Sequence, residues 1–163
     1  MVLFPDEFNC SKSLGKTLRH GPFTTRVDQE FGATIRGCAA PRRSGPDTWL
    51  NKEMIESYDR LHELGFGHSV ETYKEDRLVG GLYGIQLGRV FFGESMFSLE
   101  RDASKVALAR LVSECRARDI KVIDCQVASV HLAGLGAREV SRSEFAALLG
   151  QYASRTPQGK WLG

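Results

Sequence analysis

The chain has 163 residues, of which 42% are hydrophobic and 26% are charged, and its formal net charge is +2. These values exclude a disordered chain, because disorder requires low hydrophobic content and high net charge. No apolar run approaches the roughly 20 residues of a membrane helix, and the first ten residues do not form a signal peptide, so we expect no membrane association.

The length predicts one domain with its own core, spanning residues 1–163. The first 25 residues mix short apolar runs with prolines and glycines, which indicates a lead-in segment of strand or irregular structure with a short basic helix at 11–19. Asp28 then predicts the N-cap of a helix that has Phe31 and Ile35 on one face. Two prolines and a glycine within 41–50 predict a loop.

The next helix is predicted to begin after Asn51, which suits an N-cap, and to end at Gly65. Three strands are predicted next, at 68–76, 77–88 and 89–97. Because the turns between them are short, they should form an antiparallel meander. Gly80, Gly81 and Gly84 inside the second strand predict a bulge or a close approach of two backbones.

The last third predicts a long amphipathic helix at 101–118, a strand at 121–127 and a final helix. The final helix is introduced by a capping box, Ser141 with Glu144 three residues later, and a tail follows at 151–163. The inward face of the long helix is expected to consist of Val106, Leu108, Leu111, Val112 and Cys115.

Cysteine and histidine spacing gives no sign of a disulfide framework or a metal site. The sequence has no C-x-x-C pair, so free thiols in a reducing cytosol are expected. His62 and His68 are six residues apart across a glycine-containing turn, which is poor spacing for metal ligands. The four cysteines are Cys10, Cys38, Cys115 and Cys125.

Asp124 and Glu94 are carboxylates that lie inside two of the predicted strands. Strand side chains alternate between faces, so Asp124 and Gln126 are predicted to share one face of the strand at 121–127. A buried unpaired carboxylate is costly, so that face must meet polar groups or water. Glu94 lies among aromatic residues, where it could point to solvent from an edge strand or pair with an arginine. Together the two strands are typical of a site where protons are handled.

The order of elements resembles the acetyltransferase-like (GNAT-like) fold, an α+β fold with a mixed, mostly antiparallel sheet flanked by helices. Members that use coenzyme A carry a glycine-rich loop of the form R-x-x-G-x-G before the long helix. Residues 98–108, SLERDASKVAL, contain no glycine there, and side chains would crowd the backbone amides that hold a pyrophosphate. We therefore expect no acetyl-CoA and no other cofactor.

Six segments resemble leucyl/phenylalanyl-tRNA–protein transferases in their sequence and their order. They are TWL, LHELGFGHSVE, LVGGLYG, FFGESMFS, ASKVAL and IDCQV, and the resemblance covers residues 2–152. It implies a cytoplasmic aminoacyltransferase of the N-degron pathway. Its donor would be an aminoacyl-tRNA carrying leucine or phenylalanine (also methionine), and its acceptor the N-terminal lysine or arginine of a protein.

The same resemblance implies roles for particular residues. Asp124, Gln126 and Glu94 would serve peptide-bond formation, and Trp49 would contact the terminal adenosine of the tRNA. Ser129, where the family usually has asparagine, would also lie at the substrate. The apolar pocket for the aminoacyl side chain would be formed by Leu82, Met96 and Leu108, although periodicity alone makes Met96 and Leu108 ordinary core residues.

Other interpretations remain open at this stage. Family members usually carry a further N-terminal segment, so residues 1–25 are expected to be its remnant, and Gly134 stands where the family has serine. The shorter chain is also compatible with an enzyme that passes an amino acid from tRNA to a small amine. A relative that binds aminoacyl-tRNA or degron peptides without catalysis is a third interpretation.

Basic residues fit a tRNA partner, but they also fit an ordinary solvated surface. They are Lys12, Lys16, Arg19, Arg26, Arg36, Arg42 and Arg43 in the first third, and Arg101, Lys105, Arg110, Arg116 and Arg118 along the long helix.

Overall fold

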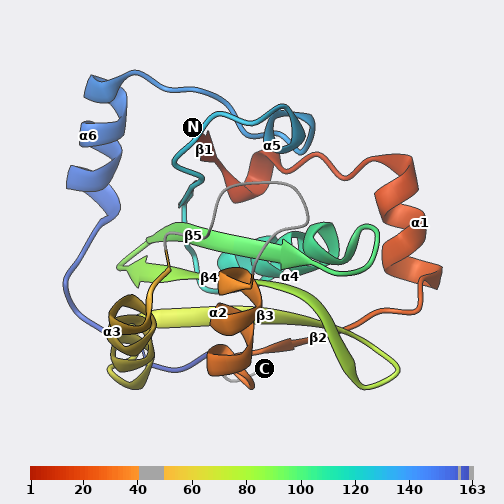
Figure 1. Ribbon diagram of the computed structural model, residues 1–163. Helices are drawn as coiled ribbons and strands as arrows, with labels where there is room; N and C mark the ends of the chain where they lie inside the picture. Colours follow the sequence, from red (N-terminus) through yellow and green to blue (C-terminus); the bar gives the residue numbers. More distant parts are fainter. Residues whose placement is uncertain (41–49, 158, 162–163) are drawn as a thin grey trace.

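The computed structural model describes residues 1–40, 50–157 and 159–161. Its centre is a six-stranded sheet with the order β1-β6-β5-β4-β3-β2 (Figure 1). The strands are β1 (Val2–Leu3), β2 (Thr24–Val27), β3 (Gly67–Lys74), β4 (Arg77–Leu87), β5 (Val90–Ser98) and β6 (Val122–Asp124). The helices are η1 (Pro5–Glu7), α1 (Lys12–His20), α2 (Phe31–Ala39), α3 (Lys52–Glu63), α4 (Ala103–Ala117), α5 (Val130–Gly134) and α6 (Arg142–Tyr152).

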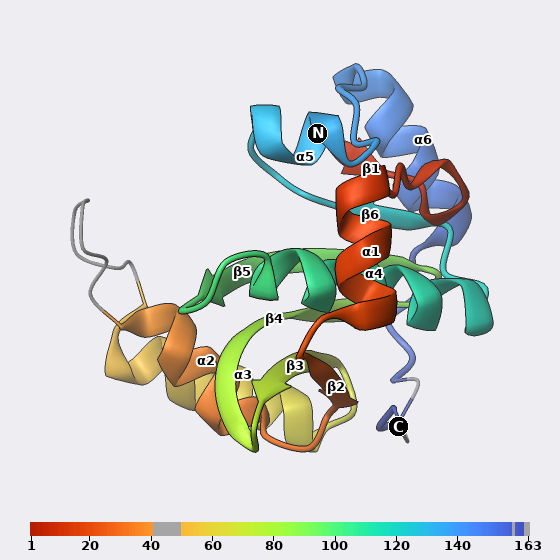
Figure 2. The same cartoon turned by 90° about the vertical axis from the view of Figure 1, so that its right-hand side faces the viewer.

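Helices cover both faces of the sheet (Figure 2). On one face, Leu82 packs in a core with Leu108 and Leu111 of α4 and Leu14 of α1. On the other face, the next residue along β4, Tyr83, packs with side chains of α2 and α3. Helix α6 closes a third cluster over β1, β5 and β6. Only β5 and β6 are parallel, so this mixed, mostly antiparallel sheet confirms the predicted fold class.

The predicted meander is confirmed, because β3, β4 and β5 pair in antiparallel order. The β4–β5 register shifts between Tyr83 and Gly84, as predicted for this glycine-containing strand. Tyr83 pairs with Ser95 and Gly84 with Gly93, so Glu94 is the extra, unpaired residue of a bulge. A Cβ at Gly84 would lie 2.2 Å from the carbonyl oxygen of Phe92, and only glycine fits there.

The main helices follow their predicted caps. The Asn51 side chain accepts the Met54 N–H at 2.9 Å, and α3 ends before Gly65, whose φ is +79°. The Ser141 hydroxyl accepts the Glu144 N–H at the start of α6. The predicted inward residues of α4 are all buried.

Two sequence predictions about local structure are wrong. The N-cap of α2 is Glu30 and not Asp28. The Asp28 carboxylate instead accepts the backbone N–H groups of Ser69 and Trp161. The last strand is Val122–Asp124 and not 121–127, because Gln126 has a left-handed φ of +60° and lies outside it. Helix α5, which has five residues, was not predicted, whereas the short strands β1 and β2 lie within or at the end of the lead-in segment that was predicted as strand or irregular structure.

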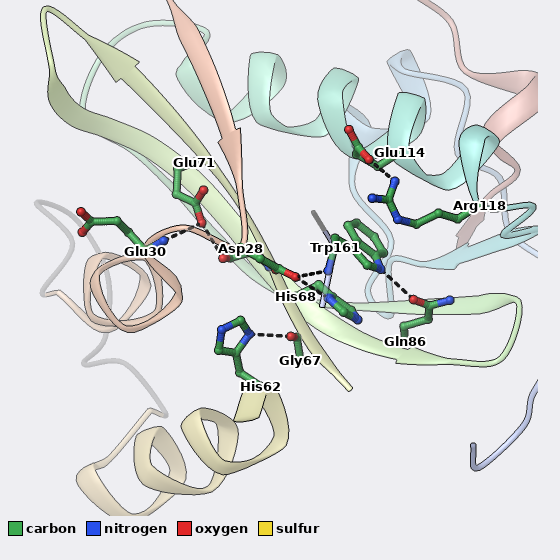
Figure 3. Close-up of polar contacts among 11 residues, drawn as sticks. Asp28, Glu30, His62, Gly67, His68, Glu71, Gln86, Glu114, Arg118 and Trp161 are labelled. Atoms are coloured by element: carbon green, nitrogen blue, oxygen red, sulfur yellow. Dashed lines mark hydrogen bonds and ion pairs between the residues drawn. The ribbon is translucent and has the colours of Figure 1, made fainter. Parts of the chain in front are cut away.

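Asp28 is the centre of a buried polar cluster that ties the segment after α6 to β3 (Figure 3). Its Oδ2 lies 2.8 Å from both His68 Nδ1 and the backbone nitrogen of Trp161. The Trp161 ring stacks on His68 at 4.4 Å, and its indole N–H donates to Gln86 Oε1 at 2.9 Å. Trp161 is 3% exposed, so this segment is part of the core.

Candidate functional site

The candidate site lies where β5 and β6 separate. The two strands pair only between residues 90–92 and 122–124, after which β5 continues along β4 while the chain turns away beyond Asp124. A cavity of about 440 Å³ occupies this place. It is lined by β4, β5 and α4, by β6 and the loop after it, and by α5.

Seven of the eight predicted site residues line this one cavity. Sequence positions from 82 to 129 are thus brought together, and Trp49 lies outside the described residues. The seven are Leu82, Glu94, Met96, Leu108, Asp124, Gln126 and Ser129.

The apolar wall of the cavity is also part of the protein core. Leu82 and Leu108 are each 3% exposed, and the half-buried Met96 packs against the same cluster. The ordinary-core interpretation therefore holds for these side chains, and they still face a space large enough for a ligand. Apolar walls with a few converging polar groups are typical of small-molecule sites.

Glu94 projects from the bulge of β5 and is half-buried. Among the described residues its partner is not an arginine but the Tyr58 hydroxyl of α3, which donates to Glu94 Oε2 at 2.9 Å. Burial and the adjacent carboxylate raise the pKa of Tyr58, so its hydroxyl stays neutral and remains a donor. The sequence placed Tyr58 on the apolar stripe of its helix and gave no signal for this contact.

Asp124 and Gln126 are brought together by a turn and not by strand alternation. Asp124 ends β6, and its Oδ1 accepts the backbone N–H of Gln126 at 2.8 Å. This bond supports the left-handed conformation of Gln126, which leaves the side chain exposed at the edge of the cavity. Asp124 and Gln126 therefore do not share a strand face as predicted. The Asp124 carboxylate instead fixes the loop that carries the Gln126 carboxamide.

Cys125, between these two residues, also lines the cavity. Burial, and next the charge of Asp124, raise the pKa of its thiol to about 11. The thiol is protonated at neutral pH and is a weak nucleophile. A covalent intermediate on Cys125 is therefore disfavoured.

The surroundings of the cavity are electrostatically asymmetric. Helix α1 contains Lys12, Lys16 and Arg19 and no acidic residue. A second cavity of about 310 Å³ lies between α1, α5 and the start of α4, and it shares His131 with the first. Helix α3, which supplies Tyr58, has four acidic and two basic side chains, excluding its histidine. A polyanion is thus favoured on the α1 side and a cation on the α3 side.

The start of α4 does not suit a coenzyme A pyrophosphate. Asp102 occupies the N-cap in a left-handed conformation with φ of +67°, and Lys105 donates to its carboxylate at 2.6 Å. A carboxylate at this position repels an anion. The segment also lacks the glycines that would let a pyrophosphate approach the backbone N–H groups. Among the described residues, no group of three or more His, Cys, Asp or Glu side chains is placed to hold a metal ion. None of the described helices is long and apolar enough to cross a membrane.

Comparison with known protein families gives one match over most of the chain. The model of the family described as leucyl/phenylalanyl-tRNA protein transferase matches residues 2–150. A leucyl/phenylalanyl-tRNA–protein transferase of Nitrosospira multiformis is 51% identical over 162 residues, which are 99% of this chain and 70% of that protein. The enzyme of the same name from Dechloromonas aromatica is 51% identical over 163 residues, with the same two coverages.

Solved structures show a similar fold at low sequence identity. A predicted acetyltransferase with acetyl-CoA from Clostridium acetobutylicum has a TM-score of 0.56 at 13% identity, covering 74% of this chain and 92% of that one. L-PGS from Bacillus licheniformis has a TM-score of 0.52 at 13% identity, covering 94% of this chain and 52% of that one. These likenesses support the acetyltransferase-like fold.

Proposed function

The chain belongs to the leucyl/phenylalanyl-tRNA–protein transferase family, and on this basis we propose that it transfers leucine or phenylalanine from aminoacyl-tRNA to the N-terminal arginine or lysine of a protein. The observation that carries the proposal is the single cavity that unites the apolar wall with Glu94, Asp124 and Gln126. Such a site can hold an apolar aminoacyl group next to polar groups that act on an amine.

The donor enters with its side chain against Leu82, Met96 and Leu108. This wall suits leucine, phenylalanine and methionine, which are flexible or flat beyond Cβ. Valine and isoleucine are branched at Cβ and cannot rotate the branch away from the pocket entrance. The basic α1 would receive phosphates of the tRNA, and His131, in the cavity beside α1, joins this surface to the reaction site.

The reaction is the attack of the acceptor α-amine on the aminoacyl ester. A C–N bond forms, the ester C–O bond breaks, and the ribose oxygen leaves with a proton while the amine loses one. The ester is already activated, so the protein needs mainly to orient the amine and accept its proton. The Gln126 carboxamide would orient the amine, and the Asp124 carboxylate would fix the loop and take the proton.

Glu94 would bind the cationic N-terminal residue of the acceptor. Its carboxylate is held by Tyr58 at the wall of the cavity, beside the acidic α3. The product would carry a new leucine or phenylalanine at its N-terminus and so be marked for degradation through the N-degron pathway. Because the donor would be charged tRNA, the proposed location of this reaction is the bacterial cytoplasm.

The test is incubation of the purified chain with radiolabelled leucyl-tRNA and a peptide that begins with arginine. The expected result is label in the peptide, and no label in a matched peptide that begins with acetylated arginine. Label in a small amine would instead favour that alternative acceptor. Binding of the tRNA without any transfer would favour the non-catalytic interpretation.

Two variants separate the acceptor role of Glu94 from general loss of charge. Glu94→Gln should raise the KM for the arginine peptide, because the charge that meets the guanidinium is lost. Glu100→Gln is the matched control, since Glu100 is also half-buried but pairs with Lys74 and Arg77 and does not line the cavity. Equal effects of both variants would contradict the assigned role.

A further inference from the structure

The hydroxyl of Tyr83 is a polar group that the proposed chemistry does not yet use. Tyr83 is 0% exposed, pairs across the sheet with Ser95 and lines the cavity. Its hydroxyl is buried and has no hydrogen-bond partner among the described residues. Buried hydroxyls are normally hydrogen-bonded, so phenylalanine would be less costly at this position unless the hydroxyl has a partner in another state of the protein.

The surroundings of Tyr83 identify that partner. The Tyr58 ring meets the Tyr83 ring edge-on, with centroids 5.1 Å apart, and the Tyr58 hydroxyl contacts Glu94. Burial, and next the nearby Tyr58, Cys38 and Glu94, raise the pKa of Tyr83, which keeps the hydroxyl neutral and able to donate. Glu94 is the adjacent carboxylate, one position along β5 from Ser95, the cross-strand partner of Tyr83.

Glu94 needs further donors once the cavity is filled. A carboxylate can accept about four hydrogen bonds, and Tyr58 provides one to Oε2. In the open cavity water can provide the others. Donor and acceptor substrates displace that water, so the carboxylate then depends on protein donors and on the acceptor itself.

We propose that Tyr83 is a positioning residue for Glu94, and that its hydroxyl donates to this carboxylate when the substrates occupy the cavity. Tyr58 and Tyr83 then hold Glu94 from two sides and aim it at the cationic acceptor. This inference rests on the proposed function, because it requires an acceptor that Glu94 binds. It also explains why the buried hydroxyl has no partner among the described residues, since its bond would form in the loaded site.

The test is a double-mutant cycle of Tyr83→Phe and Glu94→Gln, with Tyr73→Phe as control. Tyr73 is a second buried tyrosine, with the Arg26 guanidinium over its ring, and it does not line the cavity. One readout is steady-state transfer from leucyl-tRNA to the arginine peptide. The other needs no catalysis and is calorimetric binding of that peptide to protein loaded with amide-linked leucyl-adenosine, which cannot react.

Tyr83→Phe should leave the melting temperature unchanged or higher, because it removes a buried hydroxyl that has no partner among the described residues. It should weaken peptide binding and lower kcat/KM for the peptide about tenfold, with the KM for leucyl-tRNA unchanged. In the Glu94→Gln background the same change should cost less than about twofold. Tyr73→Phe should leave binding and transfer unchanged.

Several results would overturn the inference. Peptide binding unaffected by Tyr83→Phe would mean that the hydroxyl has no role at Glu94, and equal losses in both Glu94 backgrounds would mean that it acts elsewhere. If the native protein binds both probes but transfers nothing, the proposed transfer fails, while the binding cycle still decides the role of Tyr83. If neither probe binds, both proposals fail.

Discussion

Trp161 offers a direct test of whether the segment after α6 is part of the folded core. Its ring is 3% exposed, lies 4.4 Å from the His68 ring and 5.6 Å from the Phe91 ring, and has the Arg118 guanidinium 4.8 Å from its centroid. Two hydrogen bonds fix it, one to Gln86 from the indole and one to Asp28 from the backbone. Only the first depends on the side chain.

Trp161→Ala should lower the free energy of unfolding by about 3–5 kcal/mol, the usual range for removing a buried aromatic side chain. For a chain of this size each kcal/mol corresponds to about 2–4 °C, so the melting temperature should fall by roughly 10 °C. Trp161→Phe keeps most of the packing but leaves Gln86 Oε1 without its donor, and should cost about 1–2 kcal/mol.

The assay is urea unfolding followed by circular dichroism, with Lys160→Ala as the control. Lys160 is the exposed neighbour of Trp161, and its replacement should change the free energy of unfolding by less than about 0.5 kcal/mol. A loss below about 1 kcal/mol for Trp161→Ala would refute the reasoning. It would mean that the segment detaches in solution and that the cluster around Asp28 does not depend on it.

Four further predictions concern the site and the buried charge. Gln126→Ala and Asp124→Ala should each lower transfer by about 10²- to 10⁴-fold with a native circular-dichroism spectrum; near-native transfer by either would remove it from the mechanism. Leu108→Ala should reduce the preference for leucine over isoleucine, measured with separately charged tRNAs, because one methylene in an apolar pocket is worth only about 1–3 kcal/mol; an unchanged ratio would exclude Leu108 from the pocket. Burial raises the pKa of Glu71, so the folded state binds the Glu71 proton more tightly than the unfolded state does. The free energy of unfolding should therefore fall as the pH rises from the pKa of Glu71 in the unfolded state towards its higher pKa in the folded state. Glu71→Gln should remove that part of the pH dependence, and parallel curves for the two proteins would contradict it. The affinity for tRNA should drop steeply between about 50 and 200 mM salt if α1 contacts phosphates, whereas a flat curve would place the tRNA elsewhere.

The sequence alone determined the elements whose signals are local. Asn51 and Ser141 set helix starts because a capping side chain bonds to an N–H three residues away. The meander followed from short turns between strand-like segments, and the inward face of α4 followed from its periodicity. The family was also recognisable, because its motifs are contiguous and keep their order along the chain.

The tertiary structure decided the features that depend on distant partners. The sequence predicts Asp28 as a helix cap, but its carboxylate accepts the N–H groups of Ser69 and Trp161, which are 41 and 133 residues away. Gln126 left the predicted strand because Asp124 stabilises a left-handed turn that competes with strand pairing. Hydrophobic periodicity carries no information about where the phenol oxygens of Tyr58 and Tyr83 lie. The two side chains lie near Glu94 because α3 packs against the sheet at the bulge of β5. The sequence does not encode this packing locally.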